Sequence, residues 1–253
     1  MKDLDDHKKI AVLIDADNAQ YSKMTFILQE ISKHGHIITK RAYGDWSNEN
    51  LKNWKTILNE LAIQPIQQFS YTVKKNATDS SLIIDAMDLL YTNKYDAFAI
   101  ISSDSDFTKL ASRLRESQIY VFGVGEKKTP ISFRNACDDF VLTENLGEIL
   151  NSAHSLSPTP SKPEALAEEI PQDIIQILIN GWIQYKDEDD WANVAPIGSF
   201  LKRMKPDFDP RTYNASKVPE IIARIPQFEM TKFKGKGTVN IVAYRPKSTA
   251  KKD

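Results

Sequence analysis

The amino-acid sequence predicts two domains: an α/β sandwich built on a parallel sheet, followed by a small winged helix-turn-helix domain. Apolar, strand-like runs alternate with amphipathic helical segments as far as about residue 150, which is typical of a parallel sheet with helices on both faces. Asn151–Ala165 is rich in Ser and Pro and has no hydrophobic period, which indicates an extended linker. The remaining residues favour three helices and then a hairpin, the order of elements in a winged helix.

Hydrophobic spacing predicts each element of the first domain. Ile10–Ile14 is continuously apolar, as expected of a strand buried on both faces, whereas Ser22–Lys33 carries its apolar residues at helical spacing. The same criteria predict strands at Ile37–Tyr43, Ile66–Tyr71, Ala97–Ser102 and Tyr120–Val124, and helices at Asn50–Leu61, Asp79–Tyr91 and Phe107–Arg115. The Gly123-Val-Gly125 segment lacks the third glycine of a dinucleotide fingerprint, so we interpret it as a turn that completes the fold.

The second domain is predicted to contain three helices and a hairpin. A polar, acidic stretch follows the first helix. The predicted helices are Ala165–Ile179, Ile197–Met204 and Ala215–Ile225, and the hairpin strands are Phe228–Lys232 and Val239–Arg245. The expected domain boundaries are 8–147 for the first domain, 148–165 for the linker and 166–246 for the second domain.

Composition excludes several classes of protein. With 41% hydrophobic and 26% charged residues, the chain is not typical of disordered or fibrous sequences. No apolar run reaches the ~18–20 residues of a membrane span, and the charged start is not typical of a secretory signal. We therefore expect a soluble, cytoplasmic protein without a membrane partner. The single cysteine, Cys137, allows no internal disulfide and is expected to be a small buried residue.

Charge is distributed unevenly along the chain, although the formal net charge is only −1. Residues 1–150 carry 18 Lys and Arg against 21 Asp and Glu, and residues 151–196 carry 2 against 8. Residues 197–253 carry 13 against 5. A basic segment of this kind is a candidate footprint for nucleic acid, the alternative being lysines that only face solvent.

Acidic residues follow two of the predicted strands. The first strand ends in Asp15-Ala-Asp17, and Asp104-Ser-Asp106 follows the Ala97–Ser102 strand. Since ligands of parallel sheets bind beyond the carboxyl ends of the strands, we expect these side chains to share one cleft. The alternative for any single Asp is a helix cap, with Asp17 or Asp106 in that role. The recurrence of Asp-x-Asp after two separate strands favours a shared site.

The predicted site includes a third acidic segment and a cation. Asp79 begins a predicted helix and can face the same cleft from its N-terminus. Carboxylates that converge repel one another unless a cation neutralises them. Oxygen ligands, and only four histidines in the chain, favour Mg²⁺ or Mn²⁺ over zinc. Asp85 and Asp88 face away from Asp79 on a helix and are expected to be solvent-facing or structural.

Four ordered blocks of the first domain carry a family resemblance. IAVLIDADN, KKNATDSSLIIDAMDLL, FAIISSDSDF and GVGEKKTPISFRNACDDFV resemble the NYN branch of the PIN-like nucleases, the LabA-like group, over about residues 8–147. The resemblance implies a PIN-like three-layer sandwich with an acidic cluster that binds Mg²⁺ or Mn²⁺. The family's acidic positions fall on Asp15, Asp79, Asp104 and Asp106.

The resemblance also implies a reaction, the metal-assisted hydrolysis of RNA by an endoribonuclease. Products with a 5′-phosphate and a 3′-hydroxyl are expected. In this interpretation Asp15, Asp79 and Asp104 hold the metal, and Asp106 helps directly or through water. Three further residues are candidate contacts to the metal ligands or to phosphate: Asn18, Lys75 and Ser103.

The C-terminal segment resembles a second family. SFLKRMKPDFDPRTYNASKVPEIIARIPQFEM and KFKGKGTVNIVAYRP are similar to the OST-HTH (LOTUS) domain, over about residues 166–246. This resemblance implies a winged helix that binds RNA or a protein partner. The candidate phosphate contacts are Lys202, Arg203, Lys205, Arg211 and Lys217, with Lys232, Lys234, Lys236 and Arg245 on the wing. The alternative is a protein-interaction module whose lysines face solvent.

Two other functions fit parts of the sequence. A haloacid-dehalogenase-type phosphatase would use Asp15 as the nucleophile and Asp17 as the acid, but Ala19 stands where that family has Thr or Val. A non-catalytic RNA-binding or assembly adaptor would retain the acidic pocket without cleaving RNA. The sequence also leaves a homodimer open.

Overall fold

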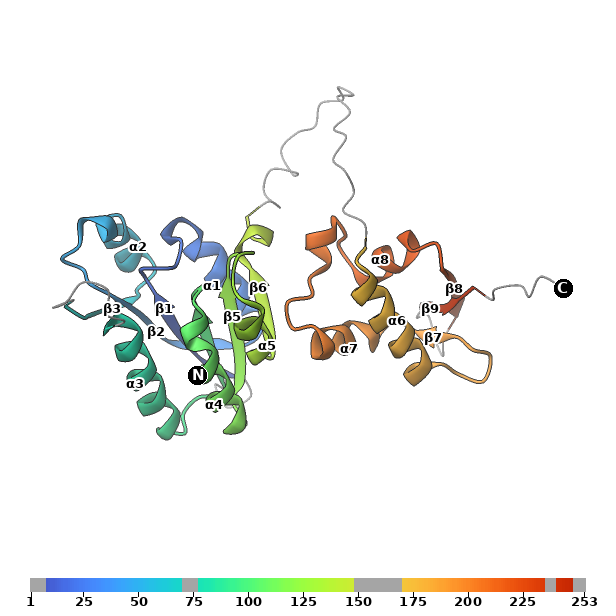
Figure 1. Cartoon of the computed structure of the whole chain (residues 1–253), viewed down its shortest axis with the longest axis horizontal. Helices are drawn as coiled ribbons and strands as arrows, with labels where there is room; N and C mark the ends of the chain where they lie inside the picture. The colour runs from blue at the N-terminus through green and yellow to red at the C-terminus, as the bar shows by residue number, and fades with distance from the viewer. Residues whose placement is uncertain (1–7, 70–76, 148–169, 235–239, 248–253) are drawn as a thin grey trace, which may run out of the picture. The chain divides into compact units, whose positions relative to one another are not determined.

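The computed structural model describes residues 8–69, 77–147, 170–234 and 240–247. The chain divides into two compact units, Met1–Leu156 and Ser157–Asp253, and we describe each unit by itself (Figure 1). The candidate contacts Lys75 and Lys236 and the predicted linker at 148–165 lie outside the described residues. Lys234 is described only as part of a strand backbone.

The first unit is built on one six-stranded sheet in which every strand is parallel to its neighbours. The strand order is β3-β2-β1-β4-β5-β6. The strands are β1 (Lys9–Asp15), β2 (His36–Gly44), β3 (Gln64–Gln67), β4 (Ala97–Ile101), β5 (Tyr120–Gly125) and β6 (Asp139–Leu142). The mixed α/β fold predicted from the alternating pattern is confirmed.

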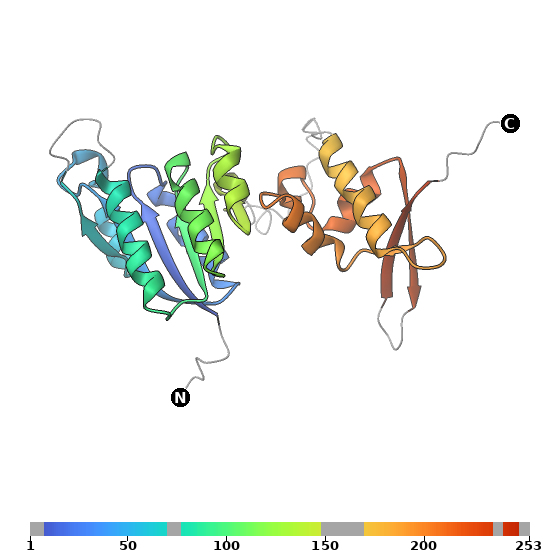
Figure 2. The same ribbon diagram turned by 60° about the horizontal axis from the view of Figure 1, so that its bottom comes forward.

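Helices cover both faces of this sheet and complete a three-layer sandwich. They are α1 (Met24–Ser32), α2 (Trp54–Glu60), α3 (Ala77–Tyr91), α4 (Thr108–Glu116) and α5 (Ile131–Ala136). Alternate residues of β1 point to opposite faces of the sheet and pack against different helices. Ile10, Val12 and Ile14 pack in the core with α1 and α2, whereas Ala11 and Leu13 pack with α3, α4 and α5. Figure 1 shows α2 and α3 on opposite sides of the sheet, and Figure 2 gives a second view.

The strand order positions the site. The chain runs outward from β1 through β2 to β3, then returns beside β1 and runs outward through β4, β5 and β6. The loops that leave β1 and β4 therefore diverge at the carboxyl edge of the sheet, the place where open parallel sheets bind ligands.

Two elements of the first unit were not predicted, the short helix α5 and the short strand β6. Gly123 and Gly125 were interpreted as a turn, but both lie in β5. The packing of β6 against β5 explains why a small residue is needed at Gly123. A Cβ on Gly123 would lie 2.3 Å from Cδ2 of Phe140 in β6, so only glycine lets this ring pack against β5.

The second unit combines helices with a small antiparallel sheet, as the sequence predicts. Its elements are α6 (Gln172–Tyr185), β7 (Ala192–Asn193), α7 (Ile197–Met204), α8 (Val218–Arg224), β8 (Phe228–Lys234) and β9 (Asn240–Pro246). The sheet order is β7-β9-β8, with antiparallel pairs. None of the helices in the described part of either unit is long and apolar enough to cross a membrane.

Helix α6 ends later than the predicted Ala165–Ile179 and includes part of the stretch interpreted as polar. Within this helix Gly181 allows a close approach of α6 and α7, since a Cβ there would lie 3.1 Å from Cδ1 of Ile197 and 3.2 Å from Cδ1 of Phe200. The helix continues across this residue although glycine lowers intrinsic helix propensity.

Candidate metal centre

Acidic residues from three separate segments meet at the carboxyl edge of the first sheet. Asp79 lies in the first turn of α3, and Asp104 and Asp106 lie in the loop that follows β4. One carboxylate oxygen from each of the three lies within 4.8 Å of the other two. Asp15, the last residue of β1, also acts on this group, because its charge contributes to the raised pKa of Asp79. The segments that the sequence predicted to converge therefore do so.

Asp15 forms the buried wall of the site, with none of its surface exposed. Its Oδ2 accepts hydrogen bonds from Ser102 Oγ at 2.6 Å and from Asn18 Nδ2 at 2.9 Å. Its Oδ1 is buried and, among the described residues, has no hydrogen-bond partner. Burial raises the pKa of Asp15, and the bonds from Ser102 and Asn18 oppose that rise. A buried carboxylate oxygen without a partner is costly unless a cation occupies its vicinity.

The carboxylate of Asp79 is partly buried and lies among other acidic side chains. Burial, and then the neighbouring carboxylates of Asp15, Asp104, Asp106 and Asp17, raise its pKa to about 6. Burial and the nearby negative charges both disfavour the ionised form of this carboxyl. A divalent cation would turn this repulsion into attraction, so the set of donors fits a hard metal ion.

Asp104 has a structural task as well as a place in the cluster. It caps the short 3₁₀ turn Ser105–Phe107, because one carboxylate oxygen accepts a hydrogen bond from the Asp106 backbone N–H at 2.9 Å. The alternative that made Asp106 the cap is therefore wrong. The cap uses Oδ1 and holds the side chain in a fixed orientation within the cluster.

The loop after β1 positions Asp17 beside the cluster. Asp17 accepts a hydrogen bond from the Thr78 side chain at the start of α3, and its pKa is raised by burial and by the charge of Asp45. It does not cap the helical segments that follow it, since the N-cap positions of the 3₁₀ turn Tyr21–Lys23 and of α1 are Gln20 and Lys23. The alternative that made Asp17 a helix cap is wrong.

The predicted polar contacts Asn18 and Ser103 lie at the same edge, each with a bond inside the protein. Asn18 donates to Asp15, as described above. Ser103 Oγ accepts a hydrogen bond from the Glu126 backbone N–H at 2.9 Å, which ties the loop after β4 to the loop after β5.

Ser102 is a site residue that sequence reasoning missed. Its hydroxyl donates to Asp15 and also accepts a hydrogen bond from the Asp104 backbone N–H at 3.0 Å. It therefore connects the ends of β1 and β4 directly. The alternation of side chains along a strand could have indicated this residue. Ser102 follows Phe98 and Ile100 at two-residue intervals, so it points to the same α3 side of the sheet as they do.

The other two acids of α3 lie outside the cluster. Asp85 forms an ion pair with Arg41 Nη1 at 2.5 Å and accepts a hydrogen bond from the buried Tyr43 hydroxyl. Asp88 is exposed. Both agree with their expected structural or solvent-facing roles.

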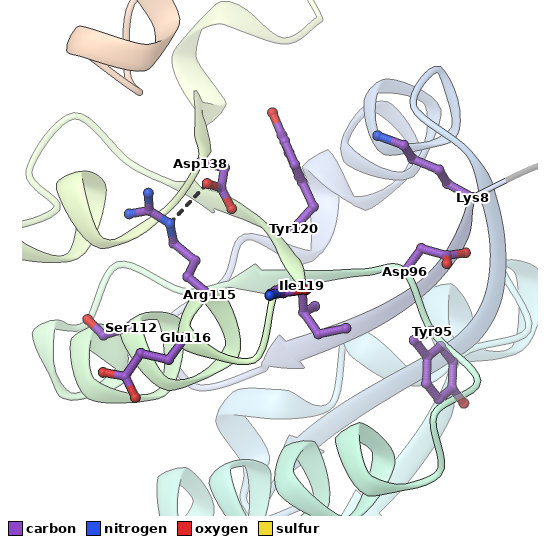
Figure 3. A pocket seen from close by; sticks show the side chains of 10 residues that line it. Lys8, Tyr95, Asp96, Ser112, Arg115, Glu116, Ile119, Tyr120 and Asp138 are labelled. Atoms are coloured by element: carbon purple, nitrogen blue, oxygen red, sulfur yellow. Dashed lines mark ion pairs between the residues drawn. The ribbon is translucent and has the colours of Figure 1, made fainter.

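A hollow of about 760 Å³ lies at the opposite, amino edge of the sheet (Figure 3). Its charged groups are engaged in the fold. Arg115 Nε pairs with Asp138 at 2.9 Å, and Asp138 also accepts from the Val121 backbone N–H. Asp96 accepts from the Lys9 backbone N–H at 2.7 Å. This hollow has no part in the acidic site.

The basic side chains of the second unit are held in several internal contacts. Lys205 pairs with Asp173 at 2.9 Å, and Arg245 pairs with Glu229 at 2.6 Å. Arg211 binds Asp209, and Arg203 donates to the Tyr185 hydroxyl. Of the other predicted phosphate contacts, Lys217 and Lys232 are exposed and Lys202 is partly buried. The positive charge of the segment is therefore only partly presented to solvent.

Comparisons with solved structures give distant similarities. A protein of unknown function from Vibrio parahaemolyticus shares 17% identity, with 56% of this chain and 95% of that chain covered and a TM-score of 0.46. An uncharacterized protein from Nitrosomonas europaea shares 25% identity, with 37% and 90% covered and a TM-score of 0.31. UDP-N-acetylglucosamine 2-epimerase shares 13% identity, with 53% and 39% covered and a TM-score of 0.38. No curated protein matches the chain.

Family models match both units. The model of the NYN domain matches residues 9–144, and the model of the OST-HTH/LOTUS domain matches residues 166–240. The NYN domain is a PIN-like nuclease domain and the OST-HTH/LOTUS domain is an RNA-binding one, so the pair supports a ribonuclease that binds RNA. The acidic cluster described above occupies the NYN part of the chain. The chain therefore belongs to the NYN family and carries an OST-HTH/LOTUS domain at its C-terminal side.

Proposed function

We propose that this protein is an endoribonuclease that depends on Mg²⁺ or Mn²⁺ and hydrolyses RNA at the acidic cluster. One observation carries the proposal. Three carboxylate oxygens lie within 4.8 Å of one another at the carboxyl edge of the sheet, next to a buried Asp15 that has one oxygen without a partner. This arrangement is unfavourable for the protein alone and favourable for a bound cation.

Asp15, Asp79, Asp104 and Asp106 would hold the metal. Oxygen donors of this kind suit Mg²⁺ and Mn²⁺, which prefer carboxylate ligands and water. When bound, such an ion supplies a water of lowered pKa and neutralises charge on the phosphate that is cleaved.

Neighbouring residues prepare the carboxylates for this task. Ser102 and Asn18 hold one oxygen of Asp15 and leave the other oxygen for the cation. The cap that Asp104 forms with the Asp106 backbone N–H fixes its side chain before a ligand arrives. Preorganised ligands of this kind cost little reorganisation during the reaction. The exposed Asp106 lies on the open side of the cluster, where substrate would approach.

The experiment is cleavage of end-labelled, single-stranded RNA with Mn²⁺, with Mg²⁺ and with EDTA. We expect cleavage with the metals only, and products with a 5′-phosphate and a 3′-hydroxyl. Asp104→Asn should abolish cleavage and keep the fold, because Asn caps helices about as well as Asp. Asp88→Asn, an exposed acid of the same domain, is the matched control and should cleave normally. Equal cleavage in the EDTA lane would refute the metal requirement.

Other outcomes would identify the competing functions. RNA binding without any cleavage would identify an adaptor. Rapid turnover of a phosphate monoester, blocked by beryllium fluoride, would identify a phosphatase that uses Asp15 as its nucleophile.

The second unit is proposed to hold the RNA through its exposed lysines. Lys217 and Lys232 are exposed and offer point charges to phosphates. Arg211 and Arg245 are paired with acidic neighbours, so they contribute less to this surface.

A further inference from the structure

Aromatic side chains cluster at the same edge of the NYN sheet as the acidic site, where they come from the segments after β1 and β2 and from the start of α2. The ring of Tyr21 lies 6.4 Å from that of Trp54, and the ring of Trp46 lies 6.3 Å from it. Trp54 is buried, Trp46 is partly buried and Tyr21 is 38% exposed. The cluster thus has a buried base and an exposed top, and Tyr21 is the exposed ring.

Hydrogen bonds hold Trp46 and the exposed Tyr21 in place. Trp46 donates from Nε1 to the carbonyl oxygen of Ile66 at 3.0 Å, and its backbone N–H donates to Gln67 Oε1 at 3.0 Å. The Tyr21 hydroxyl accepts a hydrogen bond from Asn53 Nδ2 at 3.4 Å. An exposed aromatic ring held in this way loses little conformational entropy when it binds a flat ligand.

The aromatic cluster is adjacent to the acidic residues. A Cβ on Gly44 would lie 3.6 Å from Cζ2 of Trp46 and 3.3 Å from Cβ of Ala16, so Trp46 borders the residue that separates Asp15 from Asp17. Asp45 precedes Trp46 and acts on the Asp17 carboxylate. Tyr21 itself is in the first turn after the loop that carries Asp17 and Asn18. One loop therefore connects the acids to the exposed ring.

We propose that Tyr21, supported by Trp54 and Trp46, stacks on a base of unpaired RNA beside the phosphate that the acidic site cleaves. The inference rests on the proposed ribonuclease function and adds a specificity residue to it. Bases have flat faces that stack on aromatic rings without regard to sequence. In a duplex those faces are covered by neighbouring base pairs, so Tyr21 would select single strands, loops and ends.

The test is the kinetics of Tyr21→Ala and Tyr21→Leu on a short single-stranded RNA with one cleavage site, at saturating Mn²⁺. Loss of one stacked base should raise KM by about 5- to 100-fold, with a smaller change in kcat. Tyr21→Leu retains apolar packing on Trp54, so it separates lost stacking from lost folding. Tyr21→Phe retains the ring and should behave like the wild type. Tyr91→Ala removes another exposed tyrosine and is the matched control.

RNAs with a single abasic nucleotide identify the base that stacks. A series of RNAs carries the abasic nucleotide at successive positions. At one of these positions, the KM of the wild type should rise as much as the KM of Tyr21→Ala rises on intact RNA. At that place the variant should show no further loss, since the two changes remove the same contact. Losses that multiply at every position, or a Tyr21→Ala enzyme with normal KM, would overturn the inference.

The two proposals fail in different ways. If the wild type cleaves no RNA, or if Asp104→Asn cleaves as well as the wild type, the proposed ribonuclease site is wrong. If cleavage depends on Asp104 but is indifferent to Tyr21, only the stacking inference is wrong.

Discussion

Replacing Asp79 by Asn is expected to stabilise the metal-free protein while removing its activity. Partial burial, and then the neighbouring carboxylates, raise the pKa of Asp79 to about 6. Because this pKa is higher in the folded state than the ordinary value of about 3.9, the charged form destabilises the fold at neutral pH. The penalty is complete above about pH 6 and disappears as the pH falls towards 4.

The size of the effect follows from the shift. About two pKa units correspond to roughly 3 kcal/mol at pH 7, and solvent screening at this partly exposed site reduces the gain to roughly 1.5 kcal/mol. For a domain of this size that gain raises the melting temperature by about 3 to 6 °C. With saturating Mn²⁺ the wild type should instead melt at the higher temperature, since a ligand at 100 times its Kd stabilises the protein that binds it by about 2.7 kcal/mol.

Thermal unfolding followed by circular dichroism, at pH 7 and at pH 4, with EDTA or Mn²⁺, measures these differences. Asp85→Asn is the matched control on the same helix. It should lower the melting temperature with and without metal, because it breaks the pair with Arg41. An Asp79→Asn protein that melts below the wild type in EDTA at pH 7 would refute the view that the charge of Asp79 destabilises the metal-free fold.

Three further changes test other parts of the structure. Ser102→Ala removes the donor to the buried Asp15 and should weaken Mn²⁺ binding by about 10- to 100-fold; calorimetry showing unchanged affinity would contradict this. Gly123→Ala would place a Cβ 2.3 Å from Cδ2 of Phe140 and should cost about 1 to 3 kcal/mol of unfolding free energy, visible as a lower urea midpoint. Lys232→Ala should reduce by about one the slope of the logarithm of the RNA-binding constant against the logarithm of the salt concentration. An unchanged slope would show that this lysine does not contact RNA.

The long, regular elements of the NYN domain could be predicted from the sequence because their burial is uniform. The central residues of β1, Ile10–Ile14, and all residues of β4 are apolar, since helices cover both faces of the sheet. Helix α3 carries a clear helical stripe. The edge of the sheet was harder. β6 has only four residues and α5 only six, too few to show a hydrophobic period. Gly123 in the neighbouring strand β5 is of a residue type that is typical of turns, but in the structure it allows close packing against Phe140.

The site shows the same division. The acids could be found because Asp-x-Asp follows two buried strands, and the topology then brings those strand ends together. Ser102 was missed because strand alternation places it on the α3 side of the sheet but does not show that its hydroxyl meets Asp15. The cap formed by Asp104, rather than Asp106, depends on local backbone geometry that the sequence does not specify.

Cys137 is the single cysteine of the chain and is fully buried. Burial raises the pKa of its thiol, which is therefore held as the unreactive protonated form. Maleimide dyes should consequently leave the natural protein unlabelled, and no background cysteine has to be removed. Tyr91→Cys and Lys217→Cys, at exposed positions on the two units, would then accept a donor and an acceptor fluorophore. Energy transfer between the dyes in single molecules would then report the distance between the two labelled positions with and without RNA.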